Sequence, residues 1–382
     1  MSGWIVHRAD RPKPYLARFQ PKGGRAVSKS FRTKRDADKW LEVQSVDKTR
    51  GEWVDPRRGE LTLREWSERW LAGRRVRPST MARDESVIRK LILPHLGDRR
   101  LNSITPDELR EWVADLETAG KAPATVAKAY QIAAAMIRLA IDDGRLARSP
   151  LPRRVGLPTP NREPMRFLTL AEVHHLADVI DPRYRVLVLA AGYTGLRFGE
   201  LAGLRTDTVD LLRRAVTVTA TLSDVKGRVE LREPKTPRSR RRVAISPNLA
   251  DELATHIGKF GSDGWVFTSP TGDPIRRTNF RRRAWIPATE TAGLDGVRFH
   301  DLRHTHAAAL IAQGEHPKLI SERLGHSSIR VTFDVYGHLM PGMDADAADR
   351  MDDGWDAAAR ESRTIRAPSP ITDIGRTAEN PR

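Results

Sequence analysis

The sequence predicts a multidomain chain: a small β-sheet with one helix, then an all-helical domain, then a mainly helical domain with a small β-sheet. Three observations predict this architecture. The 382 residues exceed the size of one ordinary domain. Near residue 60 the apolar pattern changes from alternation to helical spacing. Five prolines between positions 150 and 164 then interrupt the helical pattern.

Residues 1–55 are expected to form the sheet-and-helix domain. Alternating apolar residues predict strands at 4–7, 15–20 and 27–31, with a turn at PKGG, and a helix is predicted at 33–49. Basic residues outnumber acidic ones here, and a three-stranded sheet can enter a DNA major groove. We therefore expect a DNA-binding domain. A basic but merely solvated module is the alternative.

Residues 60–147 are expected to form a four-helix domain. Four stretches carry apolar residues at helical spacing and are separated by Gly and Pro breaks: TLREWSERWLAG, STMARDESVIRKLI, TPDELREWVADLE and PATVAKAYQIAAAMIRLAI. The proline-containing stretch 148–164 is expected to stay extended as a linker, because its composition cannot join either neighbouring core.

Residues 165–343 are predicted to be mainly helical, beginning with a capping box from Thr169 to Glu172. Strand-like segments interrupt the helical pattern at 215–222, 228–233 and 241–246. We expect the last two of these strands to form a hairpin whose basic tip presents Lys235. The remaining residues, 344–382, turn acidic and then polar, and the end of this segment is expected to be disordered.

The composition narrows the class of function. A net charge of +17 and a pI of about 10.6 indicate a polyanionic partner, and nucleic acid is the first candidate. No apolar run reaches 18 residues and the start lacks a signal-peptide core, so we expect a soluble intracellular protein that binds no membrane. The absence of cysteine excludes disulfides and thiolate chemistry. The sequence also contains no GxxxxGK[ST] loop, so it carries no sign of an ATPase.

Two short motifs pair an arginine with a polar residue three positions away on a helix. In TGLRFGEL, Glu200 follows Arg197 and can hold its guanidinium in one orientation. In HDLRHT, Arg303 follows His300, so an imidazole and a second guanidinium share one face. Two guanidinium groups directed at one place suit a phosphate.

Two further motifs complete a set of candidate residues. LGHSS supplies His326, and FDVYGH supplies Tyr336 ten residues later, the one persuasive nucleophile of the chain. An arginine, a hairpin lysine, HxxR, GH and a tyrosine thus follow one another within about 140 residues. In this order of residues the chain resembles the tyrosine recombinases of the phage integrase type.

The resemblance implies both the fold and the function. It implies an arm-site-binding N-terminal domain, a SAM-like core-binding domain and a catalytic domain of the DNA breaking-rejoining fold. It implies a site-specific integrase that cuts and rejoins DNA through a 3′-phosphotyrosine, without a metal, cofactor or ATP. The implied partners are core and arm attachment sites, a homotetramer on DNA, a host DNA-bending protein and an excisionase, in the bacterial cytoplasm at the nucleoid.

The resemblance also assigns roles to the residues. It makes Tyr336 the nucleophile and Glu200 the supporting acid, and the activating residues are Arg197, Lys235, His300, Arg303 and His326. Preorganised donors suit the negative charge that a phosphodiester gathers during transfer. We expect Lys235 to protonate the leaving 5′ oxygen and His300 to take the phenol proton, although the opposite division of acid and base stays open.

Two dense basic patches are expected to contact DNA phosphates beside this site. They consist of Arg238, Arg240, Arg241 and Arg242, and of Arg276, Arg277, Arg281, Arg282 and Arg283. The alternative for both is solvated surface charge. In relatives the segment after the catalytic domain docks on a neighbouring protomer, and for 344–382 a frayed tail is the competing interpretation.

Three other functions compete with this one. A type IB topoisomerase shares the chemistry but needs no specific sequence, and the basic N-terminal domain favours site recognition instead. A DNA-binding regulator with a vestigial site would form no covalent adduct. A zinc site at His300, His304 and His306 has one pair at i, i+4 spacing but neither an HExxH glutamate nor a cysteine, so we expect no metal site.

Overall fold

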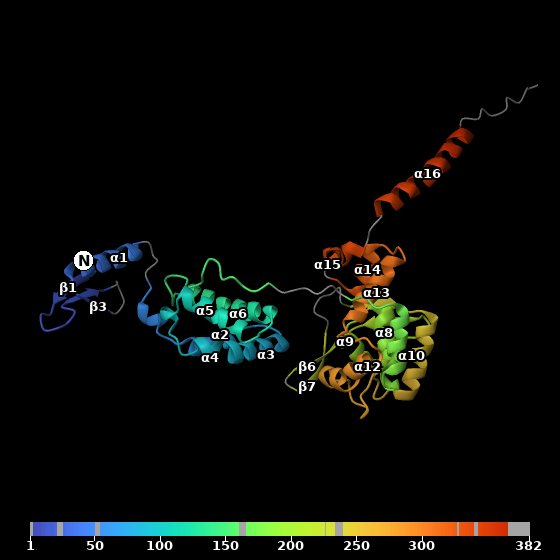
Figure 1. The fold of residues 1–382 in the computed structure, drawn as a ribbon, viewed down its shortest axis with the longest axis horizontal. Coiled ribbons are helices and arrows are strands. Elements are labelled where there is room, and N and C mark those ends of the chain that lie inside the picture. Colours follow the sequence, from blue (N-terminus) through green and yellow to red (C-terminus); the bar gives the residue numbers. More distant parts are fainter. Residues whose placement is uncertain are drawn as a thin grey trace, which may run out of the picture. The chain divides into compact units, whose positions relative to one another are not determined.

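The computed structural model describes residues 3–20, 26–49, 54–159, 166–225, 227–233, 240–326, 328–339 and 343–365. Figure 1 shows the chain coloured from its N-terminus to its C-terminus. Contacts divide it into two units, one of Met1–Pro164 with Asp224–Arg228 and the other of Met165–Ser223 with Val229–Arg382.

An antiparallel sheet and one helix begin the first unit. The strands β1 (Gly3–His7), β2 (Tyr15–Phe19) and β3 (Val27–Phe31) pair in that order, and α1 (Lys34–Thr49) packs against them. Phe19 on β2 is 1% exposed and, with Ala17 and Ala37, forms the small core. These elements confirm the predicted strands and helix, while the predicted PKGG turn lies outside the described residues.

Residues 54–159 of the first unit are mainly helical. The helices are α2 (Leu63–Gly73), α3 (Pro78–Val87), α4 (Leu93–Leu96), α5 (Pro106–Thr118) and α6 (Pro123–Asp142). A π-helical turn, Ile88–Ile92, joins α3 to α4. Capping boxes at Thr62 and Thr105 begin α2 and α5. Two buried tryptophans tie the helices together: Trp66 donates to the carbonyl of Met136 at 2.8 Å and Trp112 to that of Leu91 at 2.9 Å.

The composition of α6 has a simple explanation in the packing. This helix of 20 residues is the one described helix long and apolar enough to cross a membrane by length and composition alone. Its apolar side chains instead line the core of the helical domain, where Val126, Ala129 and Ile137 are fully buried. We conclude that α6 is a core helix.

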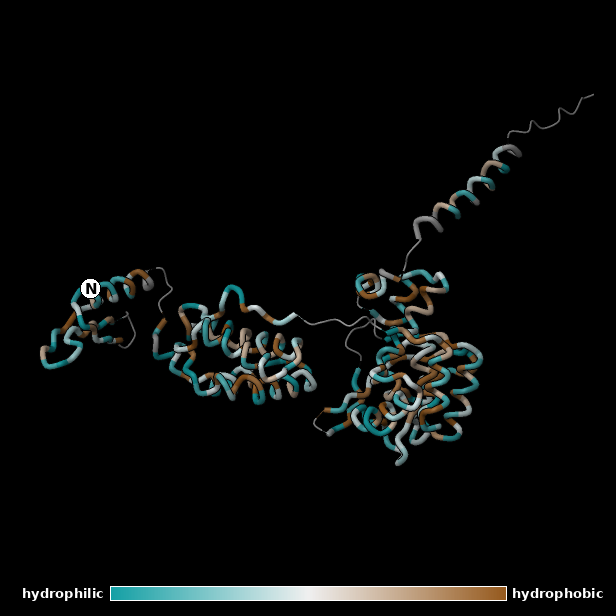
Figure 2. The backbone as a smooth tube through the Cα atoms, in the orientation of Figure 1, coloured by the Kyte–Doolittle hydropathy of each residue, from teal (hydrophilic) through white to brown (hydrophobic). Residues whose placement is uncertain are grey.

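The second unit consists mainly of helices around α8 (Pro182–Thr194). Val186 to Ala191 are buried on every side of α8, and α7, α10 and α13 pack against it. In Figure 2 hydrophobic residues recur along the helices of this unit. The other helices are α7 (Leu170–Val179), α9 (Phe198–Ala202), α10 (Pro247–Phe260), α11 (Arg277–Phe280), α12 (Ile286–Thr291), α13 (Asp301–Ala312), α14 (Pro317–Leu324), α15 (Ile329–Tyr336) and α16 (Met343–Ile365). The predicted capping box of Thr169 and Glu172 is confirmed.

The strands of this unit correct the predicted pairing. A three-stranded sheet has the order β4 (Val209–Asp210), β5 (Ala215–Val218), β8 (Arg241–Ala244), whereas β6 (Thr221–Val225) and β7 (Arg228–Arg232) form a separate hairpin. The predicted hairpin of 228–233 with 241–246 is therefore wrong, and the predicted strand 215–222 is divided. Val243 of β8 pairs with Val216 of β5 because this register buries both side chains.

Two sequence predictions concern residues outside the described part. Lys235 belongs to the connection between β7 and β8, of which residues 234–239 are not described. In the C-terminal segment, 343–365 form α16, with Met351 and Trp355 three-quarters exposed. The predicted disorder concerns 366–382, which also lie outside the described residues.

Candidate active site

A glycine turn after α8 positions the first arginine of the site. Gly195 ends α8 with φ of 65°, a left-handed conformation that favours glycine. A Cβ here would lie 2.5 Å from Cδ2 of Leu324 and 2.7 Å from Cδ2 of His306. The turn therefore requires glycine, and it places Arg197 at the start of α9.

Glu200 holds Arg197 by two contacts. Its carboxylate accepts the backbone N–H of Arg197 and the Nη1 of the same residue, both at 2.9 Å. The predicted pairing of these two residues is confirmed. Burial of Glu200 would raise its pKa, but the hydrogen bonds and charges of Arg241 and Arg197 outweigh burial and lower it. The carboxylate is thus ionised and fixes a half-exposed guanidinium.

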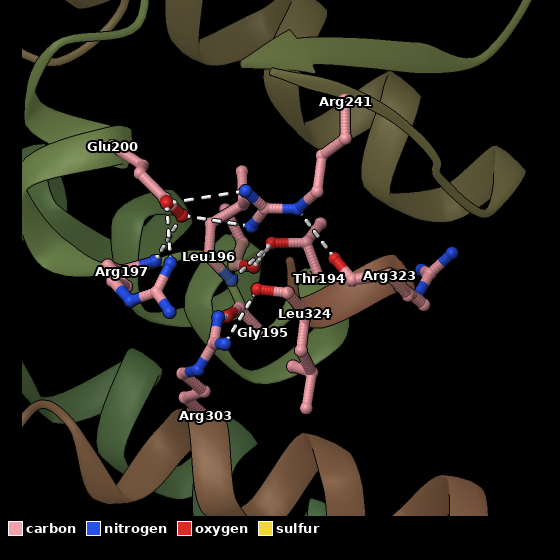
Figure 3. Close-up of polar contacts among 10 residues, drawn as sticks. Thr194, Gly195, Leu196, Arg197, Glu200, Arg241, Arg303, Arg323 and Leu324 are labelled. Atoms are coloured by element: carbon pink, nitrogen blue, oxygen red, sulfur yellow. Dashed lines mark hydrogen bonds and ion pairs between the residues drawn. The ribbon is translucent and has the colours of Figure 1, made fainter. Parts of the chain in front are cut away.

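Arg241 corrects one prediction, because it is not a surface residue. Its side chain is 7% exposed. Its Nη2 donates to Glu200 at 2.9 Å and its Nε to the carbonyl of Arg323 at 2.7 Å (Figure 3). The reason is strand alternation: Arg241 lies on the same face of β8 as the buried Val243. It links β8 to α9 and to the end of α14 rather than contacting phosphates as predicted.

Arg303 is the most deeply buried arginine of the site. It is 3% exposed, and it donates to the carbonyl of Gly195 at 2.7 Å and to that of Leu324 at 2.6 Å (Figure 3). Leu324 precedes Gly325, a second glycine with positive φ, so both carbonyls lie at left-handed turns. Burial, followed by the charge of Arg197, lowers the pKa of Arg303 to about 9. It is charged at neutral pH.

Positive charge exceeds negative charge in this cluster. Glu200 is the carboxylate that pairs with Arg197 and Arg241. Arg303 and the half-buried Arg323 form no ion pair within the described part of the chain. Four guanidinium groups and one carboxylate thus leave a net positive charge in a region of low dielectric. An anion such as a phosphate would compensate it.

The three histidines of α13 face different partners. His300 lies at the start of the helix, with its ring 5.1 Å from that of the half-buried His304. His306 is buried and accepts from Arg323 at 3.0 Å, while its other nitrogen lies 3.1 Å from the carbonyl of Gly192. Because both nitrogens of His306 are engaged, the three rings do not converge on a shared metal position.

Local burial keeps these imidazoles neutral. Desolvation, followed by the charges of His304 and Arg303, lowers the pKa of His300 to about 4. Desolvation also lowers the pKa of His304, whereas the neighbouring Asp301 opposes that change. Neutral rings beside an anionic substrate can accept or donate a proton.

His326 follows the glycine turn at the end of α14. Its backbone N–H donates to the carbonyl of Ser321 at 3.0 Å, and its Nδ1 lies 2.8 Å from Oγ1 of Thr332 on α15. Burial, followed by the charges of Arg303 and Arg197, lowers its pKa to about 4. Thr332 therefore orients a neutral ring that lies within the field of two site arginines.

Tyr336 ends α15 and is 1% exposed. Its ring packs in a small apolar cluster with Ala307, Ile320 and Leu324. Its hydroxyl lies 2.8 Å from Nδ1 of His304, whereas the sequence prediction assigns the phenol proton to His300. Burial raises the pKa of the phenol to about 12 even though the charge of Arg303 lowers it. The hydroxyl is therefore protonated at neutral pH.

The structure brings most of the candidate residues into one electrostatic environment. The charges of Arg197 and Arg303 act on His300 and His326, and the charge of Arg303 acts on Tyr336. These residues come from the N-cap of α9, from α13 and its N-cap, from the turn after α14 and from α15. Lys235 and Arg238 lie outside the described residues.

The other predicted phosphate contacts are exposed. Arg240 pairs with Glu233, and Arg242 lies 3.6 Å from Asp210. The remaining five arginines form no ion pair among the described residues. They lie just before α11, on α11 and on the π-helical turn that follows it: Arg276, Arg277, Arg281, Arg282 and Arg283. Exposed charges of this kind are available to an anionic surface.

Sequence reasoning missed two residues of the site. Arg323 donates to His306 and to the carbonyls of Tyr193 and Ala244, and no motif marked it. His304 entered the sequence analysis only as a zinc ligand, although its position next to Arg303 and one turn after His300 could have marked it. Both depend on how α13 packs against its neighbours, which local spacing does not contain.

Comparison with known families identifies the class of protein. The phage integrase family matches residues 166–342, and the N-terminal SAM-like domain of phage integrases matches residues 62–116. Together these matches cover more than half of the chain. The chain belongs to the phage integrase family of tyrosine recombinases, which are site-specific DNA strand-exchange enzymes.

Individual relatives are similar over most of their length. The prophage phiRv2 integrase of Mycobacterium tuberculosis is 29% identical over 331 residues, 84% of this chain and 87% of the relative. The ICEBs1 integrase of Bacillus subtilis is 28% identical over 291 residues, 72% of this chain and 78% of the relative. These names agree with a recombinase of phages and other mobile elements.

Solved structures show the same fold. The Tn1549 transposon integrase in complex with a circular intermediate DNA has a TM-score of 0.66 at 21% identity, covering 76% of this chain and 99% of that one. A lambda integrase dimer bound to a core site has a TM-score of 0.56 at 20% identity, covering 87% and 93%. The expected tyrosine recombinase fold, with its SAM-like helical domain, is confirmed.

Proposed function

We propose that Tyr336 is the nucleophile and that it attacks a DNA phosphate held by Arg197, Arg303 and His326. The observation that carries this proposal is the excess positive charge around Glu200. Buried guanidinium groups that have no carboxylate partner lower the stability of the folded protein, and an anionic substrate would neutralise their charge. A phosphodiester in transfer has the matching charge on its nonbridging oxygens. The tyrosine that belongs to the same environment then supplies the covalent link.

The remaining roles follow from chemistry. The Tyr336 oxygen forms a bond to phosphorus while the bond from phosphorus to the 5′ oxygen breaks, leaving a 3′-phosphotyrosine. Lys235 would protonate the leaving 5′ oxygen, and His300 would act beside it as a donor to the phosphate or as a base. In the return step the phenolate leaves more readily than an alkoxide would, so the strand is rejoined without ATP.

The arginines supply the positive charge that Mg²⁺ supplies in many nucleases, and we therefore propose a reaction that needs no metal. The exposed arginines would contact backbone phosphates on either side of the cleaved bond: Arg240, Arg242, Arg276, Arg277, Arg281, Arg282 and Arg283. Such contacts position the duplex without reading its sequence. We expect Arg238 to act in the same way.

We propose that recombination proceeds in a homotetramer on two DNA sites. Among structures with this fold is a lambda integrase tetramer bound to a Holliday junction. The domain of residues 60–147 would hold the core site together with the catalytic domain of 165–343, while residues 344–382 would dock on a neighbouring protomer. A host DNA-bending protein and an excisionase would set direction, in the cytoplasm at the nucleoid.

Residues 1–55 are proposed to bind arm-type sites through their sheet. Trp4 and Arg18 are cross-strand partners on the face of the sheet opposite Ala17 and Phe19, and Trp4 is 45% exposed. An exposed aromatic beside a basic side chain suits contact with DNA. Deleting 1–55 should spare cleavage at a core site and abolish recombination between arm-bearing sites. Full recombination by the truncated chain would remove this role.

The main test is covalent trapping. Wild type and Tyr336→Phe would be incubated, without divalent metal, with nicked suicide DNA from beside the protein's own gene, and the products separated on denaturing gels. We expect a protein–DNA adduct with wild type only. Wild type that binds this DNA without forming an adduct would favour a non-catalytic DNA-binding protein, whereas an adduct with Tyr336→Phe would identify another nucleophile.

A further inference from the structure

The hydrogen bond between Tyr336 and His304 is a feature that the roles above do not use. It joins α15 to α13 across 32 residues, with 2.8 Å between the phenol oxygen and Nδ1 and 5.7 Å between the ring centres. We propose that His304 is a further catalytic residue, the general base that takes the phenol proton as Tyr336 attacks phosphorus. The inference rests on the proposed role of Tyr336 as the nucleophile.

Position selects His304 among the histidines of α13. The ring of His300 meets that of His304 edge-on at 5.1 Å, and the ring of His304 in turn lies 5.7 Å from that of Tyr336. His306 has both nitrogens engaged by Arg323 and Gly192. His304 is therefore the imidazole within hydrogen-bond distance of the reacting oxygen, which is the first requirement of a general base.

The surroundings suit proton transfer in this direction. A phenol whose pKa is raised to about 12 by burial loses little of its proton to water at neutral pH, so attack needs an acceptor. Desolvation lowers the pKa of His304, so this imidazole is neutral and has a lone pair to offer. Asp301, at the start of α13, opposes that change and would stabilise the imidazolium once it forms.

The step balances in both directions. The Tyr336 oxygen bonds to phosphorus, its proton moves to Nδ1 of His304, and the 5′ oxygen departs with a proton from Lys235 or solvent. In rejoining, the 5′ hydroxyl attacks the phosphotyrosine, and the protonated His304 returns its proton to the leaving phenolate. His304 is thus a base in cleavage and an acid in rejoining, as microscopic reversibility requires.

A second function of the same hydrogen bond would have the opposite sign. Tyr336 is 1% exposed, so the bond could instead hold the nucleophile away from DNA. Removing a restraint would speed cleavage, whereas removing a base would slow it. The rate of covalent adduct formation on nicked suicide DNA therefore separates the two functions.

The test uses two substitutions of His304 and a matched control in the full-length chain. His304→Asn keeps an acceptor near the position of Nδ1 but cannot take a proton, and His304→Gln places its amide near Nε2. The control is His174→Asn, because His174 also lies against a tyrosine hydroxyl, that of Tyr193, at 2.8 Å from its Nε2 with 5.7 Å between rings, on the surface. Unfolding temperature and DNA binding are measured for each variant.

We expect both His304 variants to bind DNA and to form adduct ~10²- to 10⁴-fold more slowly than wild type, and His174→Asn to match wild type. Recovery by His304→Asn to within about tenfold would reduce His304 to a positioning residue and overturn its role as a base. Faster or unchanged cleavage by both variants would also overturn it. If Tyr336→Phe still forms the adduct, Tyr336 is not the nucleophile, and that result would refute the proposed function itself.

The pH profile and a sulfur substrate give readouts that a structural role would not move. The wild-type cleavage rate should fall as pH drops through the pKa of His304, and His304→Gln should lose that limb. The groups facing His304 are Tyr336 of α15, His326 after α14, Arg298, and the α13 residues His300, Asp301 and Arg303. When sulfur replaces the 5′-bridging oxygen of the DNA, the leaving group no longer needs a general acid, but the phenol still needs a base. Normal cleavage of this DNA by His304→Gln would therefore contradict the proposal.

Discussion

In each unit of the molecule a buried carboxylate lies among several cations, and the two clusters, around Asp84 and around Glu200, differ in where the cations lie. In the helical domain Asp84 is 1% exposed, and the cations around it are 25% to 56% exposed: Arg74 at 3.0 Å, Arg83 at 3.4 Å and Lys128 at 3.9 Å. In the second unit Glu200 is 3% exposed and its partner Arg241 is 7% exposed. The cations around Asp84 reach water, whereas Arg241 beside Glu200 does not.

The difference separates a structural cluster from a substrate site. Cations at the surface can be solvated, so the positive charge near Asp84 costs little folding free energy. It therefore gives no indication of an anionic ligand. Arg241 and Arg303 lie in protein, and Arg303 has peptide carbonyls rather than a carboxylate as partners. Folding must hold this excess charge in place before any substrate arrives. Such preorganisation is what stabilises a developing anion.

The largest expected effect is on stability. Glu200→Gln leaves Arg241 buried without its counter-charge, and we expect the free energy of unfolding to fall by about 3–5 kcal/mol. Chemical denaturation followed by circular dichroism measures it. A loss below about 1 kcal/mol would mean that the guanidinium groups rearrange to reach water and that the cluster is less buried than described.

The next effect is on the rate of cleavage. Arg303→Lys keeps a positive charge but cannot donate to the carbonyls of Gly195 and Leu324 in the same geometry. We expect the rate of adduct formation to fall by ~10² to 10³, with DNA binding retained. Arg74→Lys, the matched change beside Asp84, should leave the rate unchanged. Equal rates for both variants would remove the distinction between the two clusters.

A smaller effect is expected for Asp84→Asn. The cations around Asp84 can turn to solvent, so we expect a loss of about 1–3 kcal/mol in the free energy of unfolding. Cleavage by the DNA-bound enzyme should stay at the wild-type rate. If this variant instead loses cleavage while it remains bound and folded, the Asp84 cluster contributes to the reaction and is more than a structural clamp.

The smallest effect concerns surface charge in the second unit. Replacing Arg281, Arg282 and Arg283 by alanine should lower the slope of log K against log salt by about 0.9 for each DNA phosphate that the protein no longer neutralises. Arg213→Ala serves as the control, because Arg213 is an exposed arginine outside the proposed contacts, 80% exposed. Fluorescence anisotropy at several salt concentrations measures the slope. An unchanged slope in the triple variant would assign these arginines to solvated surface.

Local patterns in the sequence were sufficient to predict a contact wherever both residues lie within one helical turn. Arg197 and Glu200 are three residues apart, and so are Thr169 and Glu172, and both pairs form as predicted. The strands and helix of the N-terminal domain also follow from short-range alternation and spacing. The fold and the residues that define the family were therefore accessible from the sequence.

Contacts between distant elements were not accessible in this way. Alternation correctly indicated a strand at β8, but its pairing with β5 depends on burying Val243 against Val216, which no local pattern specifies. Arg241 consequently looked like one of several surface arginines. The contact of His304 with Tyr336 depends on the packing of α15 against α13, so sequence reasoning chose His300 for the same proton.

The hydrogen bonds of Arg303 join parts of the chain that are synthesised at different times. They close on carbonyls 108 and 21 residues away, and Tyr336 is translated after all of these partners. At about 5–20 residues per second, the interval between Arg197 and Tyr336 is on the order of ten seconds. A nascent chain, or one whose translation stops early, has Arg197 and Arg303 before it has the tyrosine that we propose cuts DNA. Interrupted synthesis therefore yields fragments that keep these arginines but lack the proposed nucleophile.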